Sequence, residues 1–306
     1  MKEKVIVIVG PTAVGKTELS LKLAKDLSGE IISGDSMQVY KELDIGTAKA
    51  TKEEQEIIPH HLIDIIKMTE EFSVSDFQTK ARSLIKDITS RGKLPIIVGG
   101  SGLYIQSILY DYQFPNEARN EELTRQLEKE VESKGIEPLY NQLKEIDPKQ
   151  ASKIHPNNHR RVIRAVEIYK TTGLTMTEIQ ARQKVTPLYD AHIIGLEMDR
   201  DLLYKRINER VDIMIQAGLV AEAKNVFDTV GENSQAMSGI GYKELVPYFK
   251  SEMSLDECIE VLKLNSRRFA KRQYTWFKNK MDISWYNISA STKQDIYDTI
   301  SAELTE

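Results

Sequence analysis

The chain has 306 residues, of which 41% are hydrophobic and 29% are charged, and its formal net charge is −4. This composition is typical of a globular protein, and it excludes a membrane-spanning helix, a chain that is basic throughout and, with Cys258 as the only cysteine, internal disulfides. The length predicts one large domain and a smaller one, and the absence of a signal-peptide pattern predicts a cytoplasmic protein.

The first predicted strand ends at Val9 and leads into a phosphate-binding loop. The loop matches the pattern G-x-x-x-x-G-K-[ST] and reads Gly10-Pro11-Thr12-Ala13-Val14-Gly15-Lys16-Thr17. Its backbone N–H groups can face a phosphate chain, Lys16 adds a positive charge, and the Thr17 hydroxyl can ligate Mg²⁺. A predicted helix follows, and the positive end of its dipole favours the same anion. The pattern does not distinguish ATP, GTP and other pyrophosphate esters.

Strand and helix patterns then alternate up to residue 104. The helix after the loop ends near Gly29, and a second helix begins with a capping box at Ser75–Gln78. His60 and His61 lack a third ligand in register, so we expect them to end a loop. Strand patterns cover residues 31–33, 62–66 and 94–98. This alternation predicts a parallel sheet with right-handed crossovers.

The pattern changes between residues 116 and 187, where strand signals vanish. Helices are predicted at 121–132, from Pro138, at 160–169 and from a capping box at Thr175. A strand at 191–196 then resumes the sheet, and helices follow at 202–216, 219–230 and 255–280. We therefore predict an α/β protein with a P-loop NTPase-like parallel sheet flanked by helices. Its core domain comprises residues 1–115 and 188–306, and 116–187 form an all-helical insertion domain.

Three further features could carry chemistry. Asp35 follows the second strand, at the sheet edge where such folds bind ligands, and it could accept a proton; its alternative role is that of a turn residue. Ser101 lies in a glycine-rich turn that could approach a ligand or simply open a helix. Arg206 and Arg210 share a helix face and could reach a pyrophosphate, although such pairs are often solvated or ion-paired.

Basic residues are concentrated in two helices. The first contains Arg160, Arg161 and Arg164. The second, within residues 266–280, has six positive and no negative side chains, and Arg268, Arg272 and Trp276 align on one face of it. A solvated helix would normally also carry acidic residues. In a net-acidic protein these clusters favour contact with RNA or DNA.

In sequence order, these motifs resemble those of the tRNA dimethylallyltransferase family, the bacterial isopentenyl-tRNA transferases. The resemblance covers nearly the whole chain. The matching stretches are residues 10–17, Asp-Ser-Met-Gln-Val-Tyr at 35–40, Ile-Gly-Thr-Ala-Lys at 45–49, His-His-Leu-Ile-Asp at 60–64, Val-Gly-Gly-Ser-Gly-Leu-Tyr at 98–104, Arg-Val-Ile-Arg-Ala at 161–165, Gly-Ile-Gly-Tyr-Lys-Glu at 239–244 and Ala-Lys-Arg-Gln-Tyr-Thr-Trp-Phe at 270–277.

The resemblance implies transfer of a dimethylallyl group from dimethylallyl diphosphate to N6 of adenine 37, beside the tRNA anticodon, with release of diphosphate. The loop at 10–17 would hold the diphosphate, with Mg²⁺ at Thr17, and Asp35, Lys16, Ser101 and Arg210 would be catalytic. A monomer without membrane contact would bind the anticodon stem-loop. The implied tRNA contacts are Asp35, Ser36, Met37, Gln38, Ser101, Arg160, Arg161, Val162, Ile163, Arg164, Tyr242, Lys243, Arg267, Arg268, Lys271, Arg272 and Trp276.

Two other functions remain compatible with the motifs. The first is an ATP-dependent small-molecule kinase of the P-loop class, which would share the loop, the sheet and an acidic residue after the second strand. The second is an RNA-binding protein that uses a nucleotide only as a switch. Tight ATP binding would favour the kinase, and a lack of pyrophosphate release with tRNA would favour the switch.

Overall fold

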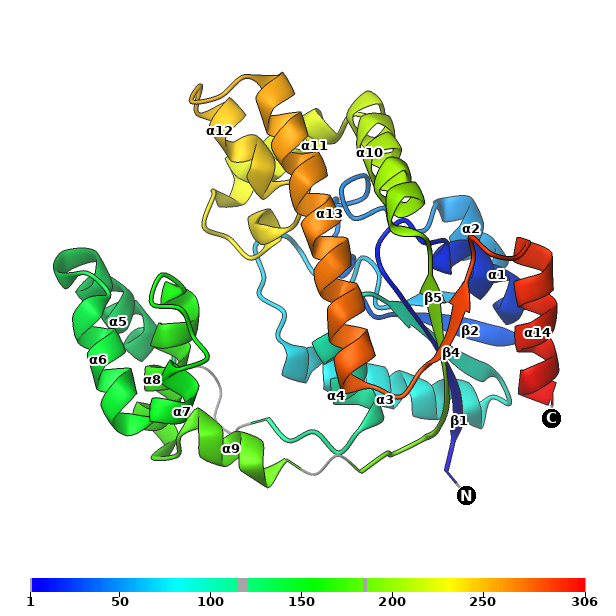
Figure 1. Cartoon of the computed structure of the whole chain (residues 1–306), viewed down its shortest axis with the longest axis horizontal. Helices are drawn as coiled ribbons and strands as arrows, with labels where there is room; N and C mark the ends of the chain where they lie inside the picture. Colours follow the sequence, from blue (N-terminus) through cyan, green and yellow to red (C-terminus); the bar gives the residue numbers. More distant parts are fainter. Residues whose placement is uncertain (1, 115–119, 184–185, 306) are drawn as a thin grey trace. The chain divides into compact units, whose positions relative to one another are not determined.

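A computed structural model describes residues 2–114, 120–183 and 186–305. The chain forms two compact units, Met1–Leu109 with Pro187–Glu306, and Tyr110–Thr186. We refer to them as the core unit and the helical unit (Figure 1). The predicted domain boundary between residues 115 and 116 falls outside the described residues.

The described part of the core unit contains one parallel sheet of six strands in the order β3-β2-β4-β1-β5-β6. The central strand β1 is buried from Val5 to Val9, as its continuous apolar sequence predicts. It pairs with β4 and β5, so residues on both sides of the helical unit complete the same sheet. The strands are β1 (Lys4–Val9), β2 (Gly29–Ser33), β3 (His60–His61), β4 (Leu94–Gly99), β5 (Asp190–Glu197) and β6 (Ser284–Asn287).

Helices flank this sheet. Ile6 and Ile8 of β1 share a buried cluster with Leu23 of α1, Ile207 of α10 and Ile300 of α14. The larger helices of the core unit are α1 (Lys16–Asp26), α3 (Val74–Ser90), α4 (Gly102–Leu109), α10 (Arg200–Gln216), α11 (Leu219–Val230), α13 (Leu255–Lys280) and α14 (Lys293–Thr305), and the short ones are α2 (Lys52–Ile57) and α12 (Val246–Phe249). No helix within the described ranges is both long and apolar enough to cross a membrane.

The third predicted strand is wrong. Residues 62–66 form a bent loop, and His60–His61, which were expected to end a loop, form β3 beside Ile31 and Ile32 of β2. Leu62 and Asp64 have φ values of 61° and 55°, a left-handed conformation that no extended strand allows. Leu62 and Ile63 are buried without belonging to a strand, whereas Ile65 is exposed.

The bounds of other elements also differ from the predicted ones. The capping residue of α3 lies two residues earlier than predicted, because Ser73 and not Ser75 caps the helix, together with Asp76. Helix α1 ends at Asp26, and Gly29 begins β2. The strand β6 and the helix α14 carry no strong sequence pattern and were not predicted.

In the helical unit the described elements are all helices. Leu127, Leu139, Leu143, Val162 and Val166 form its core. Its helices are α5 (Glu121–Lys134), α6 (Glu137–Ile146), α7 (Pro148–Ala151), α8 (His159–Thr172) and α9 (Met176–Arg182). The basic helix α8 starts at an Asn158 cap and ends at Gly173, which has φ 70°.

Candidate functional site

The phosphate-binding loop joins β1 to α1 and has an unusual backbone. Gly10, Ala13 and Gly15 have positive φ values of 146°, 65° and 104°. A Cβ at Gly10 would lie 2.6 Å from the carbonyl oxygen of Leu196, so this position requires glycine. The loop delivers Lys16 to the first position of α1, where the helix dipole favours an anion.

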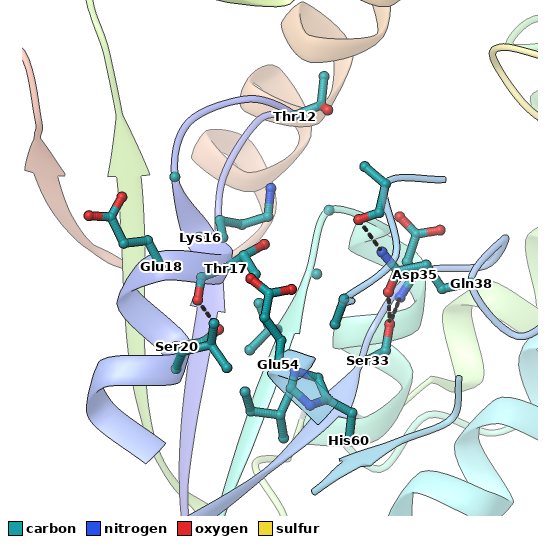
Figure 2. A pocket seen from close by; sticks show the side chains of 18 of the residues that line it. Thr12, Lys16, Thr17, Glu18, Ser20, Ser33, Asp35, Gln38, Glu54 and His60 are labelled. Carbon is teal, nitrogen blue, oxygen red and sulfur yellow. Dashed lines mark hydrogen bonds between the residues drawn. The ribbon is translucent and has the colours of Figure 1, made fainter. Parts of the chain in front are cut away.

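A cavity of about 800 Å³ lies at this loop, at the carboxyl edge of the sheet. Lys16 and Thr17 line one side of it, and Asp35 and Gln38 lie across from them (Figure 2). Its wall also includes residues from the turn after β4, from α10 and from α13, namely Gly99, Gly100, Arg206, Arg210, Phe269 and Gln273. The structure thus brings Arg206 and Arg210 of α10 to the cavity at the phosphate-binding loop.

Three charged groups in this cavity influence one another. Burial, together with the Arg210 guanidinium, lowers the pKa of Lys16 to about 8, while Asp35 opposes this shift. Burial raises the pKa of Asp35, against the opposing effects of the Met37 N–H, which donates to its Oδ1 at 2.8 Å, and of Lys16 and Arg210. Burial also lowers the pKa of Arg210. The arrangement favours an added anion beside Lys16 and Arg210 and a proton acceptor at Asp35.

The Lys16 side chain folds back over its own loop. Its Nζ donates to the carbonyl oxygens of Gly10, at 3.0 Å, and of Pro11, at 2.8 Å. The ammonium therefore lies over the part of the loop where phosphate oxygens are expected to bind.

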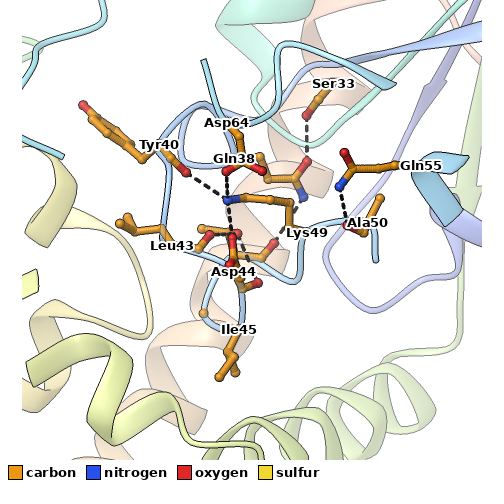
Figure 3. Close-up of polar contacts among 12 residues, drawn as sticks. Ser33, Gln38, Tyr40, Leu43, Asp44, Ile45, Lys49, Ala50, Gln55 and Asp64 are labelled. Carbon is orange, nitrogen blue, oxygen red and sulfur yellow. Dashed lines mark hydrogen bonds and ion pairs between the residues drawn. The ribbon is translucent and has the colours of Figure 1, made fainter. Parts of the chain in front are cut away.

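Asp35 begins a loop that is fixed by polar contacts. The Ser33 hydroxyl donates to Gln38 Oε1 at 2.7 Å, and the Gln38 amide donates to the carbonyl oxygen of Thr47 at 3.2 Å. Lys49, whose side chain is 4% exposed, donates to the Tyr40 carbonyl oxygen and pairs with Asp44 and Asp64 (Figure 3). These contacts connect residues along the whole segment from 33 to 64.

The same loop is attached to α11 through Glu222, a residue to which the sequence assigned no function. Its carboxylate accepts from the backbone N–H groups of Asp44, Ile45 and Gly46 at 2.9 to 3.0 Å. The Tyr242 hydroxyl also donates to it, at 2.7 Å. Because Glu222 is 176 residues from Gly46 in the chain, no local pattern could have revealed this anchor.

Gln273 on α13 is the second residue that sequence reasoning missed. Its Oε1 accepts from the Thr12 N–H at 2.9 Å, and its Nε2 donates to the Gly100 carbonyl oxygen at 3.1 Å. The side chain is buried, and it connects the phosphate-binding loop with the glycine-rich turn after β4. Ser101 follows Gly100 in this turn, directly before α4.

The predicted RNA contacts divide into exposed and buried residues. On α13, Arg268, Lys271 and Arg272 are exposed, whereas Arg267 donates to Asn208 at 2.6 Å. Trp276 packs on Gly102, where a Cβ would lie 2.2 Å from the indole.

The remaining predicted contacts divide in the same way. Arg160 and Arg161 on α8 are exposed, and Arg164 pairs with Glu167. Lys243 is about half exposed, and Ser36 and Met37 are partly buried beside Asp35. The structure does not bring three other predicted contacts to the surface, because Val162, Ile163 and Tyr242 are buried.

Few side chains of the cavity could ligate a metal ion. Among the described residues, no group of three or more His, Cys, Asp or Glu side chains could ligate one. Thr17 lines the cavity. A hydroxyl at this position of a phosphate-binding loop fits Mg²⁺, which keeps several waters and binds substrate phosphates as well.

Comparison with known proteins identifies the family. The sequence model described as IPP transferase matches residues 38–280. The chain belongs to the IPP transferase family. Two members, named tRNA dimethylallyltransferase, come from Oceanobacillus iheyensis and Anoxybacillus flavithermus and are 55% and 59% identical to this chain over 291 and 292 residues. In both cases the alignment covers 95% of this chain and 93% of the relative.

Solved structures of IPP transferases have the same fold. A tRNA Δ(2)-isopentenylpyrophosphate transferase from Staphylococcus epidermidis is 49% identical, with a TM-score of 0.74 and 99% of both chains covered. A eukaryotic dimethylallyltransferase acting on tRNA is 35% identical, with a TM-score of 0.82; the match covers 99% of this chain and 77% of that one. The predicted fold class and the resemblance are thereby confirmed, and the kinase alternative is not favoured.

Proposed function

We infer that the protein is a tRNA dimethylallyltransferase, a prenyltransferase that modifies tRNA. We propose that it moves the dimethylallyl group from dimethylallyl diphosphate to N6 of adenine 37. The observation that carries this proposal is the convergence of Lys16, Asp35 and Arg210 on one cavity at the phosphate-binding loop. An anion site and a proton acceptor are thus adjacent, which is what this transfer requires.

Binding of the donor rests on the phosphate-binding loop. Its amides and the α1 terminus would hold the diphosphate, while Lys16, Arg206 and Arg210 would stabilise the negative charge that grows on it as the allylic C–O bond breaks. Mg²⁺ bound through Thr17 would supply further charge neutralisation. The low pKa of Lys16 follows from burial near Arg210, and a bound diphosphate would favour its charged form.

Asp35 is the proposed general base. The adenine N6 forms a bond to the allylic carbon, the diphosphate leaves with the electrons of the C–O bond, and the Asp35 carboxylate takes the proton from N6. Burial raises the pKa of Asp35, so its carboxylate is a stronger base than an exposed one. Ser101 would hydrogen-bond to the diphosphate or the adenine, and Ser36, Met37 and Gln38 would line the pocket for the base.

The exposed basic residues are the proposed RNA contacts. Arg268, Lys271 and Arg272 on α13, and Arg160, Arg161 and Arg164 on α8, would bind phosphates of the anticodon stem-loop, with Lys243 as a further contact. These contacts would offset the few kcal/mol that extrusion of the adenine from its stack requires. For Arg267, Trp276, Val162, Ile163 and Tyr242 we propose supporting roles, since each packs against or bonds to another part of its unit.

The proposal further includes a cytoplasmic enzyme that acts as a monomer. Labelled dimethylallyl diphosphate, unmodified tRNA and Mg²⁺ test the function. We expect label in the tRNA and release of one pyrophosphate per transfer, and we expect no transfer to tRNA in which adenine 37 is replaced. ATP binding without donor binding would contradict the assignment, and light scattering checks the oligomeric state.

A further inference from the structure

The second and third residues of the phosphate-binding loop, Pro11 and Thr12, have no free backbone donor. Pro11 has no N–H group, and the Thr12 N–H is bonded to Gln273 Oε1 at 2.9 Å. The side-chain oxygen of Gln273, which carries a partial negative charge, therefore occupies the position that an anionic oxygen would take at the Thr12 N–H. The amides that remain for an anion belong to the later part of the loop and the start of α1.

The Gln273 side chain is fixed from both ends. Its Nε2 donates to the Gly100 carbonyl oxygen at 3.1 Å, and the residue is 6% exposed. A Cβ at Gly100 would lie 2.0 Å from Nε2, so any side chain at this position would collide with the amide group. With Nε2 bonded to Gly100, the amide is oriented so that Oε1, and not a donor, faces Thr12.

We propose that Gln273 is a specificity-determining residue that restricts the loop to a diphosphate. A diphosphate can use the later amides, Lys16 and the α1 terminus. A triphosphate would need space and hydrogen-bond donors for one more phosphate group. Near the beginning of the loop, that group would meet Gln273 Oε1, an acceptor that already occupies the Thr12 N–H. This inference rests on the proposed function, because a diphosphate ester is the donor in that reaction.

The test compares two inorganic anions that need no turnover. Calorimetry with Mg²⁺ gives the dissociation constants of pyrophosphate and of tripolyphosphate for the full chain, and the parent should bind pyrophosphate more tightly. In Gln273→Ala the preference should fall by about tenfold, the effect of one hydrogen bond to a charged group, because tripolyphosphate gains the Thr12 amide. Gln273→Met, which retains side-chain length but lacks the acceptor, should shift the preference in the same direction.

Two controls complete the experiment. Asn279→Ala removes an exposed amide from the same helix and should leave the preference unchanged. Thermal melting identifies which variants are folded. If a folded Gln273→Ala or Gln273→Met protein keeps the parental preference, the inference is wrong, even when transfer to tRNA is intact. If the parent prefers pyrophosphate and the Gln273 variants lose this preference, but the parent transfers nothing to tRNA, the proposed function fails and the role of Gln273 stands.

Discussion

Lys16, Asp35 and Arg210 carry ionisable groups that are partly buried around one cavity. Burial of one of these charges without the others would cost free energy. Burial shifts the pKa of each group in the direction that favours its neutral form. The negative charge of Asp35 opposes this shift for Lys16 and Arg210, and their positive charges oppose it for Asp35. A bound diphosphate would add the negative charge that the two cations favour, so donor binding should compensate for much of their desolvation.

Replacement of Asp35 by Asn tests the proposed base. The amide oxygen can still accept from the Met37 N–H, so the turn should persist, but the side chain cannot take a proton. We expect kcat to fall by about 10²-fold or more, with the Kd for tRNA changed far less. Single-turnover transfer and a binding titration measure the two quantities. Parental kcat in this variant would remove Asp35 from the role of base.

The pKa of Lys16 predicts an alkaline limit for donor capture. The lysine is charged below about pH 8 and neutral above it in the free enzyme. Because only the charged form attracts the diphosphate, kcat/KM for the donor should decline as the pH rises through about 8. Initial rates at low donor concentration between pH 7 and 9.5 measure this. Constant kcat/KM across that range, with the protein folded throughout, would contradict the assigned role.

The sequence could identify the residues whose function follows from a local pattern. Lys16 and Thr17 belong to a recognisable loop, and Asp35 follows a strand at the edge that binds ligands. It could not identify Glu222 or Gln273, because the groups that they hold lie more than 170 residues away in the chain. An isolated Glu or Gln on a helix has no distinguishing spacing.

Helix α13 has two faces with different contacts. Cys258, Leu262, Ala270 and Phe277 are buried together with Gln273, whereas Arg268, Lys271 and Arg272 in its second half are exposed. The capping box at Ser254 and the apolar spacing made both ends of this helix predictable. The strand expected at 62–66 did not form, because Leu62 and Asp64 have positive φ values and Leu62 and Ile63 are buried in a loop that Lys49 contacts through Asp64.

The outward face of α13 should contribute to RNA affinity through charge. Lys271→Ala and Arg272→Ala should each weaken tRNA binding and reduce the slope of log K against log salt by about one unit. Binding titrations at several salt concentrations give the slope. Lys86→Ala removes the same charge from an exposed position on α3 and should leave the slope near that of the parent. Parental slopes in the α13 variants would assign this face to structure alone.

At the scale of the whole molecule, the helical unit is inserted into a sheet that is complete without it. The Leu188 N–H donates to the Leu109 carbonyl oxygen at 2.8 Å, so the chain leaves the core unit and returns to it at adjacent positions. Each unit also has its own buried apolar cluster. The two units can therefore be separated without breaking a strand.

Replacement of residues 110–186 by a short Gly-Ser linker tests this separation. The core unit retains the phosphate-binding loop, so we expect pyrophosphate binding to persist. The exposed arginines of α8 are lost, so affinity for tRNA should fall by at least about tenfold. Calorimetry and filter binding measure the two effects. Parental tRNA affinity in the shortened protein would exclude the helical unit from RNA binding.

The strand order also constrains how the protein forms on the ribosome. The strand β1 emerges first, yet its neighbour β5 is translated only after the 180 residues that separate Val9 from Asp190. During most of synthesis, the β1 edge that faces β5 is unpaired and apolar, as aggregation-prone nascent chains are. The helical unit has its own buried cluster and can fold in the meantime, and the donor site is completed when α13, which carries Gln273, has left the exit tunnel.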